Sequence, residues 1–113
     1  MSGWIGVDLD GTLAEYHGWV DGGKIGKPVP KMLARVKRWL KAGKTVRIVT
    51  ARVAGDHDGS ERWRIKAWCK EHLGQDLEVT NKKDYGMIEL WDDRAVEVQK
   101  NTGVPVNLQR RKE

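Results

Sequence analysis

Two pairs of carboxylates, each placed directly after a short apolar run, constrain this chain more than any other feature. The first pair is Asp8 and Asp10, and the second is Asp92 and Asp93 near the other end of the chain. An apolar run that stops at charged residues is typical of a buried strand that opens into a polar loop. Because the carboxyl ends of parallel strands meet at one edge of a sheet, the two pairs are predicted to lie together.

The remaining pattern alternates strands and helices, which favours βαβ units and an α/β fold. We expect a Rossmann-like, three-layer sandwich whose mostly parallel sheet has five strands. The strands are predicted over residues 4–7, 45–50, 77–80, 87–91 and 95–98, and the helices between Pro30 and Gly43 and between Ser60 and Gly74.

The length of 113 residues predicts a single domain over residues 1–113. Asp21-Gly22-Gly23, flanked by apolar residues, is a hairpin signal, so a small β-hairpin flap is expected over residues 13–27. Residues 109–113 form a polar tail. No stretch is long enough to make a large cap domain beside the sheet.

Composition narrows the class of partner. The chain has 21 Lys and Arg against 16 Asp and Glu, a net charge of +5, which favours anionic partners such as phosphorylated metabolites or nucleic acid. One cysteine, Cys69, allows no intramolecular disulfide and fits a reducing, cytoplasmic setting. No apolar run reaches membrane-spanning length, so no membrane association is expected. The composition leaves homo-oligomerisation open.

The paired carboxylates suit phosphoryl transfer. A phosphoryl group repels nucleophiles until its charge is neutralised, and Mg²⁺ does this while bound to carboxylates and carbonyls. Asp8, Asp92 and the main-chain carbonyl of Asp10 are the candidate metal ligands. Asp8 is the candidate nucleophile for an aspartyl-phosphate intermediate, and Asp10 is the candidate proton donor and acceptor.

Other residues are predicted to hold the phosphoryl oxygens. Thr50 follows a β-branched strand, and its hydroxyl and the neighbouring backbone N–H groups suit anion binding. Gly11 permits a sharp turn close to a ligand. Lys83 offers a compact positive charge. Arg52 is a candidate contact for a substrate anion, and an ordinary surface arginine is an equal alternative.

Together these residues resemble the haloacid dehalogenase superfamily of phosphohydrolases. The four motifs are Asp8-Leu9-Asp10-Gly11-Thr12, Val49-Thr50, Lys83 and Asp92-Asp93, and the resemblance covers residues 4 to about 98. It implies strand order 5-4-1-2-3, a capless member, and outer-sphere placement of Asp93. It also implies catalytic roles for Asp8, Asp10, Thr50 and Lys83, with Lys82 as an alternative lysine. Gly11, Thr12, Ala51 and Arg52 are the matching substrate-binding positions.

The expected activity is therefore Mg²⁺-dependent hydrolysis of a phosphomonoester, a small sugar or nucleotide phosphate. Alternatives are a nucleic-acid 3′-phosphatase and a non-catalytic module that binds a phosphorylated ligand. His17 and Trp19 are candidates for touching the leaving group, although packing is an equal interpretation. His57 lies in the acidic loop 54–59, and a polar loop is the better interpretation than a metal cluster there.

Overall fold

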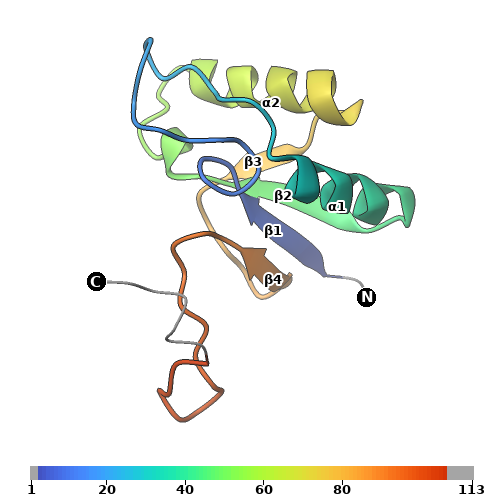
Figure 1. Cartoon of the computed structure of the whole chain (residues 1–113), viewed down its shortest axis with the longest axis vertical. Coiled ribbons are helices and arrows are strands. Elements are labelled where there is room, and N and C mark those ends of the chain that lie inside the picture. Colours follow the sequence, from blue (N-terminus) through green and yellow to red (C-terminus); the bar gives the residue numbers. More distant parts are fainter. Residues whose placement is uncertain (1–2, 107–113) are drawn as a thin grey trace.

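The computed structural model describes residues 3–106 of the chain. Four parallel strands form one sheet in the order β3-β2-β1-β4 (Figure 1). The elements are β1 (Trp4–Asp8), α1 (Pro30–Lys41), β2 (Thr45–Val49), a 3₁₀ turn η1 (Ala51–Val53), α2 (Ser60–Leu73), β3 (Glu78–Thr80) and β4 (Met87–Trp91). The α/β class, the parallel sheet, both helices and four of the predicted strands are confirmed.

Helices α1 and α2 cover the same face of the sheet and bury one common core (Figure 1). Right-handed crossovers explain this arrangement, since the chain steps in one direction from β1 through β2 to β3. The core draws on β1 (Ile5, Val7), β2 (Val46, Ile48), β3 (Val79), α1 (Met32, Val36) and α2 (Ile65, Trp68, Cys69). The described residues therefore make two layers, and the predicted three-layer sandwich is wrong for them.

Residues 81–86 connect β3 to β4, which lie at opposite edges of the sheet. Asp84 accepts a hydrogen bond from Trp4 Nε1 at 2.8 Å, and Arg47 stacks on the Trp4 ring with its guanidinium 4.4 Å from the ring centre. Arg47 Nη1 also lies 3.7 Å from Asp84. A connection this short carries no helix, which is why the third layer is missing here.

The predicted fifth strand over residues 95–98 is also wrong. Val98 instead pairs in an antiparallel bridge with Pro105, outside the sheet. The N–H of Gln99 donates to the carbonyl of Val104 at 2.8 Å. The chain reverses because Asn101 and Gly103 adopt positive φ angles of 68° and 77°. This turn extends away from the sheet (Figure 1).

The predicted hairpin flap over residues 13–27 forms no paired strands, so that prediction is wrong as well. The segment is a loop whose two ends are joined by backbone hydrogen bonds. Glu15 N donates to Lys27 O at 2.8 Å, and Val29 N donates to Leu13 O at 2.7 Å. An isolated antiparallel bridge joins Ala14 to Pro28 at the base of this loop, and Asp21, Gly22 and Gly23 all have positive φ angles at its tip.

Within residues 3–106, no helix is long and apolar enough to cross a membrane. The predicted polar tail over residues 109–113 lies outside the described residues.

Candidate functional site

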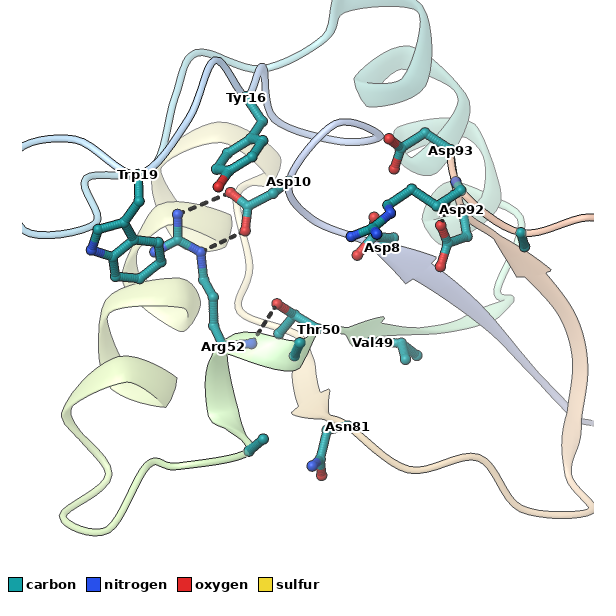
Figure 2. Close-up of a pocket in the computed structure, with 14 residues that line it drawn as sticks. Asp8, Asp10, Tyr16, Trp19, Val49, Thr50, Arg52, Asn81, Asp92 and Asp93 are labelled. Atoms are coloured by element: carbon teal, nitrogen blue, oxygen red, sulfur yellow. Dashed lines mark hydrogen bonds and ion pairs between the residues drawn. The ribbon is translucent and has the colours of Figure 1, made fainter. Parts of the chain in front are cut away.

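One pocket of about 890 Å³ opens at the carboxyl edge of the sheet (Figure 2). Asp8 ends β1, Thr50 follows β2 and Asp92 follows β4, and all three line this pocket. The predicted meeting of three strand ends is therefore observed. The remaining lining residues come from the turn after β1, the loop over residues 13–28 (the 13–28 loop), the end of β2, η1 with the residue after it, and the segments after β3 and β4: Asp10, Tyr16, Trp19, Val49, Ala51, Arg52, Ala54, Asn81, Asp93, Arg94 and Ala95.

Three carboxylates gather on one side of the pocket. Asp8, Asp92 and Asp93 each offer an oxygen, and these oxygens all lie within 4.8 Å of one another. Burial, a hydrogen bond with Asp93 and the charges of Asp92 and Asp93 raise the pKa of Asp8 to about 7. The carboxylates are thus held together against their mutual repulsion, which a bound cation would relieve.

Thr12 ties the loop after β1 to the loop after β4. Its Oγ1 donates to Asp93 Oδ1 at 3.0 Å and accepts the backbone N–H of Asp93 at 3.0 Å. Gly11 has a φ of 88°, and a Cβ placed there would lie 2.6 Å from Asp93 Oδ2. Both residues were predicted to bind substrate, and in the structure they bring Asp93 close to Asp8.

This donor set fits Mg²⁺ in its chemistry. Carboxylate oxygens are the hard ligands that Mg²⁺ and Ca²⁺ prefer, and Asp8, Asp92 and Asp93 face one another across distances that one ion spans. Asp93 lies in this cluster, and the family resemblance implies an outer-sphere place for it there. The side chain of Asp10, by contrast, lies outside the cluster.

Asp10 and Arg52 form a bidentate ion pair (Figure 2). Arg52 Nε donates to Asp10 Oδ2 at 2.7 Å, and Nη2 donates to Oδ1 at 2.9 Å. Arg52 Nη1 also donates to Glu61 at 2.9 Å, and the arginine side chain is only 4% exposed. These pairings raise the pKa of Arg52, the bond to Asp10 contributing most. Arg52 is therefore a buried residue that fixes the position of the Asp10 carboxylate.

Thr50 is buried at the end of β2 and begins the η1 turn. Its Oγ1 accepts the backbone N–H of Arg52 at 3.1 Å, and its own N–H donates to the carbonyl of Thr80 at 2.9 Å. The hydroxyl hydrogen remains available for a ligand in the pocket. Ala51, predicted to bind substrate through its backbone, is exposed on the same wall.

The two candidate lysines do not reach the pocket. Lys82 and Lys83 are exposed, and neither lines it. The chain turns away just before them, since Lys82 N donates to Thr80 Oγ1 at 3.0 Å. Asn81 is the residue of this segment that faces the pocket (Figure 2).

The acidic loop over residues 54–59 caps a helix. Asp56 accepts the backbone N–H of Arg62 at 2.9 Å at the start of α2, and its side chain is 2% exposed. Asp58 accepts the N–H of Ser60 at 3.0 Å. Among residues 3–106, the one group of acidic, His or Cys side chains with metal-binding spacing is that around Asp8. Asp56 and Asp58 are thus engaged with backbone N–H groups at the start of α2.

Sequence reasoning missed several pocket residues. Tyr16 was not singled out, although it stands three positions before Trp19 in a glycine-rich loop, a spacing that hinted at an aromatic rim. Trp19 does line the pocket, whereas His17 does not and its side chain is 85% exposed beside Glu15. The pairing of Asp10 with Arg52 had no local signal, because 42 positions separate them.

Comparison with known proteins places the fold but no function. No protein-family model matches the chain, and no curated protein matches it. Among solved structures, the chain is similar to one described as the structure of a conserved protein from Bacteroides thetaiotaomicron. The two have a TM-score of 0.62 and 21% sequence identity, and the match covers 85% of this chain and 79% of that chain. At this identity the similarity shows the shared fold alone.

Proposed function

We propose that this chain is a Mg²⁺-dependent phosphomonoesterase with a Rossmann-like fold of the haloacid dehalogenase type. The observation that carries the proposal is the joining of Asp8, Asp92 and Asp93 at one sheet edge, with ligand oxygens within 4.8 Å. The Thr50 hydroxyl on the same pocket wall supports it. Bound Mg²⁺, held by these carboxylates, would neutralise charge on the phosphoryl oxygens.

The proposed chemistry runs in two steps. An oxygen of Asp8 attacks phosphorus, the bond from phosphorus to the ester oxygen breaks, and Asp10 gives a proton to the departing alcohol. Asp10 then takes a proton from a water molecule that attacks the aspartyl phosphate, which restores Asp8 and releases phosphate. Arg52 contacts both oxygens of Asp10 in the structure, so one of these oxygens has to leave the ion pair before it can carry the proton.

Phosphate release from p-nitrophenyl phosphate tests this proposal. We expect turnover with Mg²⁺, loss of turnover with a chelator, and a fall of at least about 10³-fold in Asp8→Asn, since a covalent nucleophile is removed. Asp92→Asn should raise the Mg²⁺ concentration that gives half-maximal rate. Asp76→Asn, an exposed carboxylate outside the pocket, is the matched control. Equal rates in wild type and Asp8→Asn would contradict the proposal.

A second candidate is a module that binds a phosphorylated ligand without hydrolysing it. The exposed placement of Lys83 and the engagement of both Asp10 oxygens by Arg52 favour this alternative. Binding of a phosphate ester with no phosphate release under any metal condition would select it over the enzyme.

A further inference from the structure

Two exposed aromatic side chains form the rim of the pocket on the 13–28 loop. Tyr16 is 47% exposed and Trp19 is 60% exposed, and both line the pocket. Figure 2 shows Tyr16 beside Asp10, and Trp19 beside Arg52 on the side away from Asp8. Exposure of this much aromatic surface at a pocket wall is typical of a binding site for another apolar group.

The Trp19 ring is held in place from one side. The Arg52 guanidinium lies 4.8 Å from the ring centre, and the ring packs so closely on Gly23 that a Cβ there would overlap it. Gly23 O accepts hydrogen bonds from Arg52 Nη1 at 2.5 Å and from Arg64 Nη2 at 2.8 Å. Arg52 and Gly23, the two residues that pack on the Trp19 ring, are therefore hydrogen-bonded to each other. The ring is thus fixed before a ligand arrives, which lowers the entropy cost of binding.

The same arginine connects the ring to the reacting groups. Arg52 contacts Trp19 with its flat face and Asp10 with its edge. Because Asp10 is proposed to protonate the leaving oxygen, the rim lies on the side of the pocket that the leaving group would occupy. This step rests on the proposed function.

The chemistry of the wall favours a planar ring over a sugar as that leaving group. Polar side chains such as Asn81 line the same pocket, so the preference for a planar ring rests on the exposed rings of Tyr16 and Trp19. An aromatic side chain that packs on a cation binds another aromatic ring by stacking, whichever base carries that ring. We propose that the pocket binds phosphate esters whose alcohol part carries a planar base, so that nucleoside monophosphates are preferred over sugar phosphates.

Adenosine 5′-monophosphate and ribose 5-phosphate are the matched probes, because they differ only in the base. Calorimetric titration in the Asp8→Asn background with Mg²⁺, where neither ligand is hydrolysed, should show at least about fivefold tighter binding of the nucleotide. Trp19→Ala should bring the nucleotide affinity down to that of ribose 5-phosphate and leave the latter unchanged. Trp19→Phe, which keeps a ring, should retain most of the preference. Trp63→Ala removes another exposed tryptophan, outside this pocket, and should change neither affinity.

Equal affinities in the protein that keeps Trp19, or no nucleotide binding at millimolar concentration, would overturn the proposal. A Trp19→Ala variant that loses both ligands equally would also overturn it, because the ring would then serve only the fold. Binding is measured apart from turnover. A base preference without phosphate release would therefore contradict the enzyme and support the ring site, and phosphate release without a base preference would do the reverse.

Discussion

Removing the charge of Asp8 should stabilise the metal-free protein at neutral and alkaline pH. Burial and the neighbouring carboxylates raise the pKa of Asp8 from 3.8 to about 7. The native state therefore holds this proton more tightly than the unfolded chain does. The stability that comes from the proton is fully present below pH 3.8 and is lost as the pH rises through about 7.

The magnitude follows from the shift. About three pKa units correspond to roughly 4 kcal/mol of unfolding free energy as a ceiling. Asp8 is partly exposed, so solvent screening reduces this to about 1–2 kcal/mol. Asp8→Asn keeps the shape of the side chain and removes the charge. At pH 8 its Tm should therefore exceed that of the wild type by about 4–8 °C.

Thermal unfolding followed by circular dichroism from pH 4 to pH 8, with a chelator present, measures this difference. The two proteins should melt together near pH 4 and separate as the pH rises. Asp76→Asn, which removes an exposed carboxylate, should follow the wild type at every pH. Adding Mg²⁺ at tenfold its Kd should raise the wild-type stability by about 1.4 kcal/mol and leave Asp8→Asn nearly unchanged. A variant less stable than the wild type at pH 8, or a difference independent of pH, would show that the charge of Asp8 does not destabilise the native state.

Three further outcomes follow from other parts of the site. Arg52→Ala should cost about 3–5 kcal/mol of unfolding free energy in chemical denaturation, because the substitution leaves two carboxylates without their partner in a partly buried place. Gly11→Ala should cost more than about 1 kcal/mol and weaken Mg²⁺ binding by calorimetry, because its φ of 88° and the nearby Asp93 carboxylate oppose a Cβ; Gly55→Ala, in open space, should change neither quantity. Burial raises the pKa of Cys69 to about 12, so an aromatic disulfide reagent at pH 8 should label it only after the protein unfolds, and rapid labelling of the native protein would contradict this packing.

The predictable parts of the fold are those that short stretches of the sequence indicate by their pattern of apolar and polar residues. Short apolar runs that end at Asp8, Thr50 and Asp92 marked three strand ends, and the rule that parallel strands share an edge brought them together. The alternation around Val96 and Val98 looked the same as a strand. In the structure, the turn at Asn101 instead pairs Val98 with Pro105, which follows the turn, so this segment does not join the sheet.

The parts that were not predictable depend on contacts distant in the sequence. The bidentate ion pair of Arg52 with Asp10 joins residues 42 positions apart, and no sequence pattern near either residue indicates its partner. The missing third layer follows from the short β3 to β4 connection, whose path is fixed by the bond from Trp4 to Asp84. Packing and ligand contact were equal interpretations of Trp19. In the structure its ring packs on Arg52 and also lines the pocket.

If Asp8 is the nucleophile for phosphorus, it carries a phosphoryl group during turnover. The most direct measurement stops the reaction in acid during turnover of a phosphate ester with Mg²⁺, and examines the peptide that carries Asp8 by mass spectrometry. We expect a phosphoryl group on Asp8 that is absent without Mg²⁺ and absent in Asp8→Asn. Steady phosphate release with an unmodified Asp8 peptide, or release that continues in Asp8→Asn, would contradict it.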